Sequence, residues 1–293
     1  MTLAATGTLV AEAAAGRRAV AAFNIITLEH AEAVIAGAEA VRAPVVLQVS
    51  ENAVKYRQGQ VLPLARAAAA AAEAAEVPVA LHLDHVKSAE LLRQAASAGF
   101  TSVMFDAAHL TYAQNLAATR SAAEWAHANG LWIEAELGEV GGKGGAAPLD
   151  AHAPGARTDP EEAREFVAAS GVDALAVAIG STHAMTTRTG VLDHGLLARL
   201  AAAVDVPLVL HGSSGLPDGE LAAAVAGGIT KVNIGTALNV AMTDAIRAYL
   251  DAHPSAADTR TYLSVGRAAM ARTTSELITA LGAGRPLTES VRV

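Results

Sequence analysis

Short apolar, β-branched runs alternate along this chain with longer alanine-rich stretches of helical character, and no other feature limits the fold as strongly. Eight strands are expected, over residues 19–25, 45–50, 79–85, 102–106, 132–137, 174–179, 208–211 and 231–234. Helical patterns, such as those over 28–41 and 160–169, fill the gaps between them. Repeated strand–helix units indicate a parallel sheet. Eight such units predict a closed α/β barrel whose functional residues gather at the C-terminal ends of the strands.

The barrel is expected to be a single domain. No break in composition marks a boundary, so residues 1–293 are predicted to form one (β/α)8 TIM-barrel domain. An open, doubly wound sheet is the alternative. Neither a GxGxxG nor a GxxxxGK[ST] pattern follows the first expected strand. Nucleotide sites of those two types are therefore unsupported.

The composition argues against several classes of function. A formal net charge of −8 and a pI near 5.7 disfavour nucleic-acid or anionic-membrane partners. The chain has no cysteine, so a metal site must use His, Asp or Glu, and the protein fits a reducing compartment. The N-terminal stretch lacks the basic-then-apolar order of a signal peptide, and no apolar run of about 18 residues predicts a membrane span. We expect a cytoplasmic protein.

Polar side chains collect at the expected strand ends. They are Asn24, Gln48, Ser50, Asp84, His85, Asp106, Glu134, Glu136, His183, His211, Asn233 and Thr236. A lone strand-end histidine is usually a hydrogen-bonded core residue. His85, His183 and His211, however, belong to three strands of one barrel and would converge on one rim. Three neutral imidazoles with one open position form a catalytic zinc arrangement, so these histidines are the expected metal ligands.

Other histidines are expected to have structural or surface positions. His82 lies three residues before His85 on the same strand and should point to the opposite face. His30 and His127 fall in helical patterns and are expected at the surface.

Two glycine-bearing turns indicate an anion site. They are HGSSG, over 211–215, and NIGT, over 233–236, after the seventh and eighth expected strands. Barrels commonly hold phosphate at the loops after these strands, and backbone N–H nests favour anions. Two ordinary tight turns are the alternative. Their place beside the candidate metal ligands favours a phosphate-carrying substrate.

At this point the chain resembles a known family, the class II, zinc-dependent ketose-bisphosphate aldolases of the fructose-bisphosphate and tagatose-bisphosphate type. The resemblance runs from AFN near residue 23 to about residue 270. It rests on LHLDH (81–85), EAELG (134–138), DALAVAIGSTH (173–183), PLVLHGSSGLPD (207–218) and KVNIGTALNVA (231–241). Five patterns in order at similar spacing are unlikely to arise by coincidence.

The resemblance implies a role for each matching position. It implies Zn²⁺ at the three histidines and, in many relatives, a monovalent cation (Na⁺ or K⁺) near the phosphate. Asp84 matches the catalytic acid–base group, and Asp106 and Glu136 match acidic positions that bind a second metal or the displaced zinc. The positions matching substrate and phosphate contacts are Asn24, Ser50, Gly212, Ser214, Asn233, Gly235 and Thr236, and Gln48 is expected at the same mouth. Because successive strand side chains point apart, the strand must end or twist at Asp84 and His85 for both to serve one site.

The chain departs from the family pattern at three places. Relatives carry an acid in the loop after the fifth strand that removes the substrate proton, whereas residues 141–145 here read GGKGG. Glu139 and Asp150 are the nearest carboxylates of the long loop over 138–158, which is expected to lie over the mouth. Ala184 replaces a glycine that helps to bind phosphate. Asp258-Thr259-Arg260 stands where relatives often carry DPR, whose Arg can reach the distal phosphate.

The expected function is reversible, zinc-dependent cleavage of a ketose bisphosphate, first of all fructose 1,6-bisphosphate, to dihydroxyacetone phosphate and glyceraldehyde 3-phosphate. Tagatose 1,6-bisphosphate or another ketose phosphate, including a monophosphate, is the alternative substrate. A three-histidine zinc hydrolase or isomerase, or a non-catalytic barrel, is the alternative class. The resemblance also implies a homodimer or homotetramer. The helix expected over 237–250 could supply the interface, or it could face inward as an ordinary barrel helix.

Overall fold

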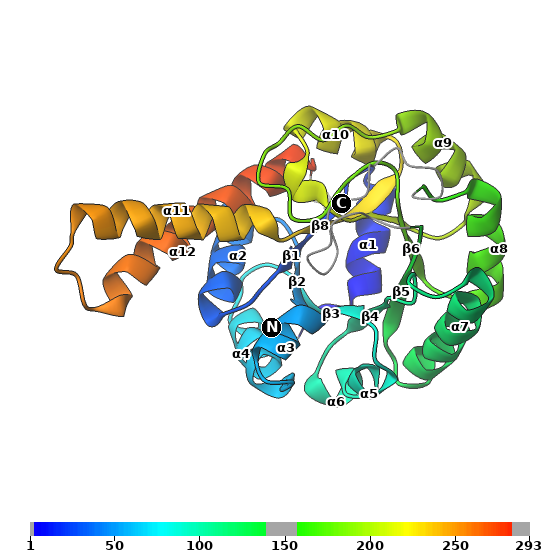
Figure 1. The fold of residues 1–293 in the computed structure, drawn as a ribbon, viewed down its shortest axis with the longest axis horizontal. Coiled ribbons are helices and arrows are strands. Elements are labelled where there is room, and N and C mark those ends of the chain that lie inside the picture. The colour runs from blue at the N-terminus through cyan, green and yellow to red at the C-terminus, as the bar shows by residue number, and fades with distance from the viewer. Residues whose placement is uncertain (1–2, 139–156, 283–293) are drawn as a thin grey trace, which may run out of the picture.

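The computed structural model describes residues 3–138 and 157–282, and these form a closed barrel of eight parallel strands in sequence order (Figure 1). The strands are β1 (Val20–Asn24), β2 (Val45–Ser50), β3 (Val79–Val86), β4 (Ser102–Phe105), β5 (Trp132–Leu137), β6 (Ala174–Val177), β7 (Leu208–Leu210) and β8 (Ile229–Ile234). The last strand pairs with the first, which closes the sheet. The predicted (β/α)8 barrel is confirmed, and the open sheet is wrong.

The helices surround the barrel. They are α1 (Thr6–Ala15), α2 (Leu28–Ala40), α3 (Glu51–Tyr56), α4 (Leu62–Glu73), α5 (Ala89–Leu92), α6 (Ala95–Ala98), α7 (Tyr112–Ala128), α8 (Pro160–Ser170), α9 (His194–Ala203), η2 (Ser213–Gly215), α10 (Asp218–Ala226), α11 (Thr236–Ala252) and α12 (Thr259–Ala280). Local sequence sets the start of several. Asp159 caps α8 by accepting hydrogen bonds from two backbone N–H groups, with Pro160 in the first turn. No helix of the described residues is long and apolar enough to cross a membrane.

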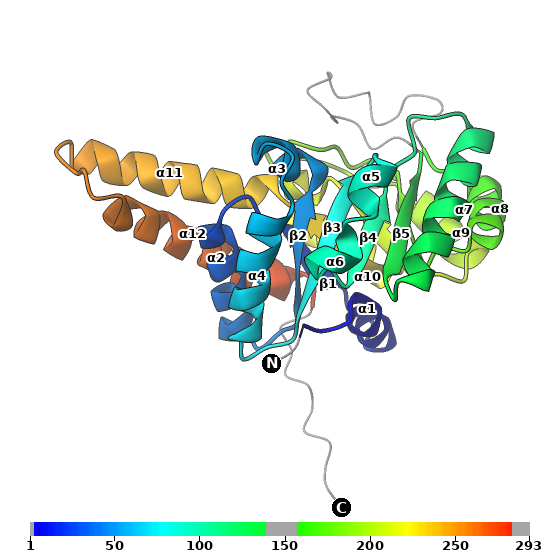
Figure 2. The same ribbon diagram turned by 90° about the horizontal axis from the view of Figure 1, so that it is seen from below.

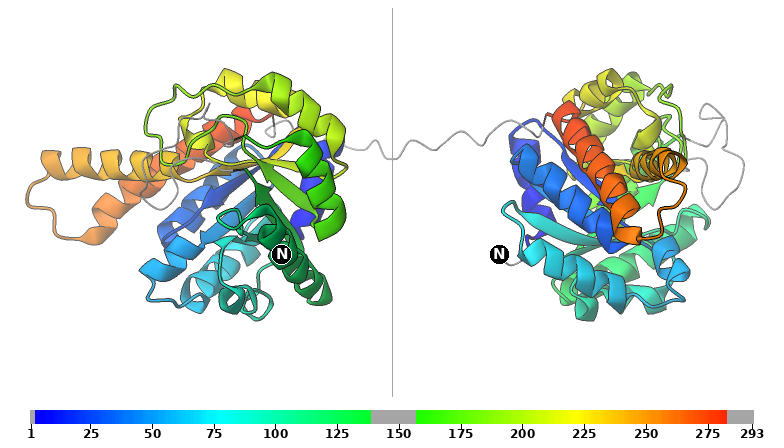
Figure 3. Two further views of the ribbon diagram at one scale, coloured as in Figure 1. Left: turned by 45° about the vertical axis from the view of Figure 1, so that its right-hand side comes forward. Right: turned by 90° about the vertical axis from the view of Figure 1, so that its left-hand side faces the viewer.

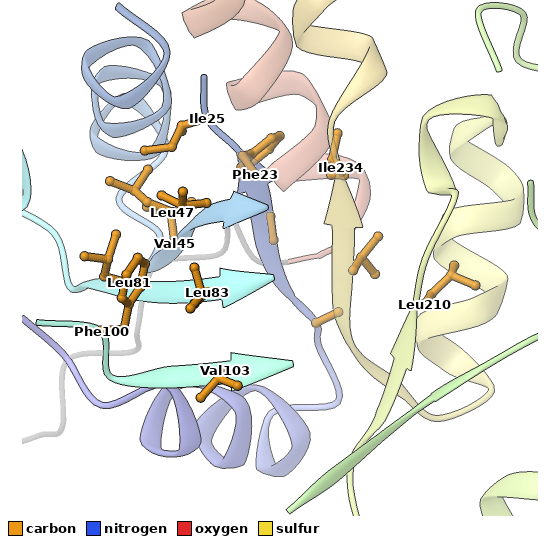
Figure 4. Packing of buried hydrophobic residues seen from close by; sticks show 14 of the residues in the cluster. Phe23, Ile25, Val45, Leu47, Leu81, Leu83, Phe100, Val103, Leu210 and Ile234 are labelled. Atoms are coloured by element: carbon orange, nitrogen blue, oxygen red, sulfur yellow. The ribbon is translucent and has the colours of Figure 1, made fainter. Parts of the chain in front are cut away.

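The main hydrophobic core lies between the strands and the surrounding helices. Outward-facing side chains such as Phe23, Leu47, Leu81 and Leu83 are fully buried there (Figure 4). Because strand side chains alternate between faces, the residues between them point into the barrel. These inward positions carry the polar groups of the site.

The barrel interior is layered. Helix α1 lies across the N-terminal ends of the strands (Figure 2), where Leu9 and Val10 pack against the small inward side chains of Ala22, Val46 and Ala80. The layer above this apolar plug is polar, and the mouth is above that layer. The N-terminal end of the barrel is closed by apolar side chains, so the active site can lie only at the open, C-terminal end.

Helices α11 and α12 form a hairpin that projects from the barrel (Figures 1 and 3). Its root is held because α12 packs along α2. A Cβ on Gly37 of α2 would come within 2.5 Å of the Ala271 carbonyl oxygen, so the glycine permits this close approach. Leu238 is the buried residue of α11. The alternative of an ordinary inward-facing helix over 237–250 is therefore wrong.

Candidate active site at the mouth of the barrel

The end of β3 brings Asp84 and His85 to the same cavity by a local irregularity. The pairing of β3 with β4 shifts register between Leu83 and Val86. His85 adopts a left-handed backbone conformation, with φ of 51°. A non-glycine residue pays for this conformation in strain, which is a common feature of functional sites. The twist turns His85 towards the mouth beside Asp84, as the sequence required, and both line one cavity.

The irregularity also corrects one expectation. His82 and His85 do not face opposite sides, because the bulge between them removes the regular alternation. His82 is fully buried inside the barrel, where Nδ1 lies 2.7 Å from Oγ of Ser102. Burial lowers its pKa to about 3, with a further contribution from the nearby Lys231 ammonium, so the ring is neutral. Its expected structural role agrees with this environment.

The three histidines predicted as ligands come together. One ring nitrogen from each of His85, His183 and His211 lies within 4.8 Å of the others. Their ring centroids are 4.8 to 5.9 Å apart, in edge-to-face arrangements. A group of three imidazoles, one at the end of β3 and two from the loops after β6 and β7, fits a divalent ion such as zinc.

Two carboxylates hold His211 from behind. Nε2 lies 2.8 Å from Oε1 of Glu134, and Nδ1 lies 3.0 Å from Oε2 of Glu136, with all three side chains fully buried. Burial alone lowers the pKa of His211, but its hydrogen bonds to the two carboxylates outweigh burial and raise that pKa to about 9. Carboxylates that contact a ligand histidine orient its ring and increase its basicity.

A third carboxylate contacts His85. Oδ2 of Asp106 lies 3.1 Å from Nδ1 of this histidine, and Asp106 is almost fully buried. Asp106 and Glu136, predicted as second-metal or alternate ligands, thus each contact one histidine of the cluster. That role remains a prediction.

Asp84 is a buried carboxylate with one anchored oxygen. Asn24 of β1 donates from Nδ2 to Oδ2 at 2.8 Å. Within the described part of the chain no donor reaches Oδ1 at hydrogen-bonding distance, and His82 Nε2 lies 4.0 Å from it. Burial alone would raise the pKa of Asp84, but His85 and His211 outweigh burial and lower it. Asp84 is therefore an ionised carboxylate with one hydrogen-bonded oxygen and one buried oxygen that no donor of the described residues reaches.

A buried lysine lies beneath the mouth and was not anticipated from the sequence. Lys231 Nζ donates to Gln48 Oε1 at 2.9 Å, to Glu134 Oε2 at 2.9 Å and to Asn233 Oδ1 at 2.7 Å. Burial alone would raise the pKa of Glu134, but Lys231 and His211 bring it down to about 2. The lysine therefore supports the carboxylate that holds a candidate metal ligand. Gln48, expected at the mouth, is fully buried in this network instead.

The mouth contains a cavity of about 270 Å³. Ten of the expected catalytic, metal and substrate positions line it: Asn24, Ser50, Asp84, His85, His183, Gly212, Ser214, Asn233, Gly235 and Thr236. Lining residues that sequence reasoning missed are Ile26, Asn52, Ser213 and Asn239. Asn52 and Asn239 lie in the first turns of α3 and α11, and no strand-end pattern could have found them.

The loops after β7 and β8 are linked by Ser214. Its Oγ accepts from the backbone N–H of Gly235 at 3.4 Å and of Ala237 at 3.2 Å, at the start of α11. Gly212 has φ of 66°, and a Cβ there would come within 2.7 Å of the Thr182 backbone. The two loops expected to form an anion site thus lie together at the N-terminus of a long helix, where anions bind well.

Four other sequence predictions concern residues whose environment in the structure is described next. Ala184 lines the cavity with φ of 60°, so alanine occupies a left-handed position that glycine would adopt without strain. Arg260 lies at the start of α12, paired with Asp258, and its side chain is 89% exposed. His30 is buried, not at the surface. Glu139, Asp150 and the 141–145 segment lie outside the described residues.

A closed (β/α)8 barrel whose C-terminal mouth combines a three-histidine cluster, a buried carboxylate and an N–H nest defines an enzyme of the barrel class. Comparison with known proteins identifies the family within that class. Residues 4–285 match the family described as Fructose-bisphosphate aldolase class-II, and the chain belongs to it. The chain is therefore an aldolase, which removes the hydrolase, isomerase and non-catalytic alternatives.

Solved structures agree. The YdjI aldolase from Escherichia coli K12 is 30% identical with a TM-score of 0.82, over 97% of this chain and 98% of that one. A protein from Coccidioides immitis, provisionally assigned as a fructose-1,6-biphosphate aldolase, is 31% identical with a TM-score of 0.84, over 96% of each chain. Fructose-bisphosphate aldolase from Campylobacter jejuni is 22% identical, with a TM-score of 0.81 over 96% of each chain, and supports the fold.

Proposed function

We propose that this protein is a zinc-dependent aldolase that reversibly cleaves a ketose phosphate to dihydroxyacetone phosphate and an aldehyde. The observation that carries the proposal is the group of three histidines beside Asp84 at the barrel mouth. His85, His183 and His211 are the proposed zinc ligands. Zinc, when bound, supplies Lewis-acid stabilisation of the negative charge left on the dihydroxyacetone phosphate half.

Asp84 is the proposed acid–base group. In cleavage it takes the proton of the C4 hydroxyl; the C3–C4 bond then breaks and leaves its electron pair on the dihydroxyacetone phosphate half. In condensation it returns a proton to the aldehyde oxygen. Asn24 holds the carboxylate through Oδ2, and Asp84 lines the cavity in which the substrate is proposed to bind.

The phosphate is proposed to bind at the loops after β7 and β8. Gly212, Ser214, Gly235 and Thr236 are the proposed contacts to the phosphate, with a monovalent cation nearby. Asn233 is 6% exposed, and Lys231 fixes its Oδ1. Its Nδ2 finds no hydrogen-bond partner among the described residues. Asn233 also lines the cavity, so its Nδ2 is the proposed donor to an oxygen of the bound substrate.

The group that removes the proton from dihydroxyacetone phosphate in condensation is proposed to come from the segment 139–156. Glu139 and Asp150 are the carboxylates of this segment. Single substitution of each by Gln or Asn, followed by exchange of the C3 proton of dihydroxyacetone phosphate with deuterium, would identify it.

We also propose that residues 1–293 act as one domain and that the protein assembles as a homodimer or homotetramer. The projecting hairpin of α11 and α12 supports an assembly, because an isolated hairpin of this kind covers little apolar surface by itself. Light scattering of the purified protein measures the subunit number.

The function is tested by cleavage of fructose 1,6-bisphosphate, tagatose 1,6-bisphosphate and ketose 1-phosphates by protein of known zinc content, with dihydroxyacetone phosphate as the readout. We expect activity that is lost on chelation and restored by zinc. Asp84→Asn should retain zinc and lose most cleavage. Activity that persists in the chelated protein would contradict the proposal.

A further inference from the structure

A buried histidine that the proposed chemistry does not use lies directly below Asp84. His82 comes two residues before Asp84 on β3, so both side chains point into the barrel. His82 is fully buried and is not part of the cavity lining at the mouth. Any effect of this histidine on the reaction therefore has to act through a neighbouring side chain.

Two polar atoms without partners face each other between these side chains. Nε2 of His82 lies 4.0 Å from Oδ1 of Asp84. Neither atom has a hydrogen-bond partner among residues 3–138 and 157–282, and a buried polar atom left unpaired is destabilising. The gap is about 1 Å longer than a typical N–H···O hydrogen bond. Because hydrogen bonds of catalytic groups often shorten only in the substrate complex, this pair is suited to form one there.

The surroundings of His82 determine which ring nitrogen carries the proton. Burial and the Lys231 ammonium lower its pKa to about 3, so the ring is neutral and has one N–H group. A proton on Nδ1 would leave the lone pair of Nε2 facing the ionised carboxylate of Asp84 in a medium of low dielectric constant. A proton on Nε2 instead points a donor at that carboxylate. The favoured tautomer therefore has the proton on Nε2, and Nδ1 is an acceptor.

A chain of hydroxyl groups supports this tautomer. Oγ of Ser102, the register partner of His82 on β4, lies 2.7 Å from Nδ1 and 2.5 Å from Oγ1 of Thr6. Oγ1 of Thr6 is also 3.0 Å from Oγ1 of Thr101, whose own proton goes to the Leu81 carbonyl oxygen at 3.1 Å. The Thr6 proton therefore remains for Ser102, and the Ser102 proton for Nδ1. The hydrogen bonds thus run in one direction, from α1 to the imidazole.

A hydrogen bond from His82 would hold the second oxygen of Asp84. Asn24 already donates to Oδ2 at 2.8 Å, and His82 is placed to donate to Oδ1. Each carboxylate oxygen has a further lone pair, so both hydrogen bonds leave the group able to accept a proton. Two contacts fix the plane of the carboxylate, whereas one contact permits rotation. Its orientation matters, because a displacement of about 1 Å can slow a reaction roughly a hundredfold.

We propose that His82 is a positioning residue for Asp84. In the substrate complex its Nε2–H donates to Oδ1 and, with Asn24, holds the carboxylate in the orientation that takes the C4 hydroxyl proton. The inference rests on the proposed acid–base function of Asp84 and extends it to a residue that does not touch the substrate. Through Thr6 and Ser102, it also connects the helix that closes the barrel to the reaction at the mouth.

The test compares two reactions of the zinc-loaded, full-length enzyme. Cleavage of the best of the ketose phosphates named above requires Asp84 to accept the C4 hydroxyl proton. Exchange of the C3 proton of dihydroxyacetone phosphate with deuterium involves no C4 hydroxyl. His82→Phe should lower kcat for cleavage about 10- to 100-fold. KM and the exchange rate should stay within about twofold of the unsubstituted enzyme, because the affected interaction is made in the transition state of cleavage.

Three further variants separate positioning from a loss of packing. The amide of glutamine can place an N–H group where Nε2 lies, so His82→Gln should recover most of the lost cleavage. Ser102→Ala removes the donor to Nδ1 and should lower cleavage, but not exchange, by a smaller factor; it serves as the test if His82→Phe does not fold. His127→Phe removes an exposed histidine that lies 3.0 Å from Asp173, and this matched control should alter neither reaction.

The tautomer gives a readout that does not depend on activity. Nitrogen-15 NMR of histidine-labelled protein reports which ring nitrogen carries the proton. The His82 signals are those that disappear in His82→Gln. We expect a protonated Nε2 and an unprotonated Nδ1.

The outcomes distinguish this inference from the proposed function. A proton on Nδ1, cleavage by His82→Phe at the unsubstituted rate, or an equal fall of cleavage and exchange in either variant would overturn the inference while the function stands. No recovery of cleavage in His82→Gln would also overturn it. If the unsubstituted enzyme shows neither zinc-dependent cleavage nor exchange, the proposed function fails, and the inference fails with it.

Discussion

Replacement of Lys231 by methionine is expected to destabilise the barrel strongly. The ammonium group donates to three acceptors inside the barrel, at 2.7 to 2.9 Å, and both Lys231 and Glu134 are fully buried. Methionine keeps the length of the side chain but removes the charge. The Glu134 carboxylate would then keep His211 as its partner but lose the cation that lowers its pKa most.

The magnitude follows from the cost of leaving a buried charge without its partner, which is about 3–5 kcal/mol. A value near 4 kcal/mol lowers the ratio of folded to unfolded protein roughly a thousandfold. Removing both charges should recover most of this, because Glu134→Gln no longer requires a cation. The double variant Lys231→Met/Glu134→Gln is therefore expected within about 2 kcal/mol of the unsubstituted protein.

Urea unfolding at pH 7, followed by circular dichroism, measures all four proteins of this double-mutant cycle. The Lys231→Met midpoint should fall by about 1 M or more, as expected from typical m-values. The deficit should shrink as the pH is lowered, because protonation of Glu134 removes the unpaired charge. A loss below about 1 kcal/mol for Lys231→Met, or a double variant less stable than Lys231→Met, would refute the reasoning.

Three further outcomes are expected. Ala184→Gly should stabilise the protein by about 1 kcal/mol in thermal unfolding, because Ala184 has a left-handed φ of 60° that glycine adopts freely. Gly212→Ala should reduce phosphate affinity and stability together in ligand titration and unfolding, because its Cβ would come within 2.7 Å of the neighbouring backbone. Glu51→Gln should cost about 1 kcal/mol at pH 7. Burial raises the pKa of Glu51, but the Lys55 ammonium and the Lys87 N–H outweigh it and lower that pKa. The Glu51 contribution is therefore complete above about pH 4.5 and lost as the pH falls through the lowered pKa, so urea midpoints of the two proteins should converge in acid.

The barrel could be predicted because its signals are local. Each strand is a short apolar run, and some of the helices that follow have their own N-caps, such as Asp159 before α8. The expected bounds of β2 and β5 match the structure. The histidine cluster followed from topology, since parallel strands end on one rim. The shared orientation of Asp84 and His85 was harder to predict. Regular alternation along a strand places neighbouring side chains on opposite faces, and the irregularity at His85 brings both to the same cavity.

The parts that escaped prediction depend on partners far apart in the sequence. The sequence around Lys231 does not indicate that its side chain will contact Glu134 and Gln48 across the barrel. His30 sits in an ordinary amphipathic pattern, and its burial depends on Asn239, which α11 brings alongside. The hairpin of α11 and α12 was missed for a similar reason. The apolar residues of α11 predict that one face is buried, but they do not identify the element that covers it.

The closed barrel has a consequence for the time at which the metal site can form during synthesis. The histidines come from β3, β6 and β7, and β8 must reach β1 before the sheet closes. Chains leave the ribosome N-terminus first at roughly 5–20 residues per second. A growing chain therefore offers one histidine of the set, then two, and completes the set only when most of the protein has been made. The proposed metal site can be complete only after His211 has been made, so a fragment that ends before His211 would lack the full set of proposed ligands. Loading with metal would then distinguish finished molecules from unfinished ones.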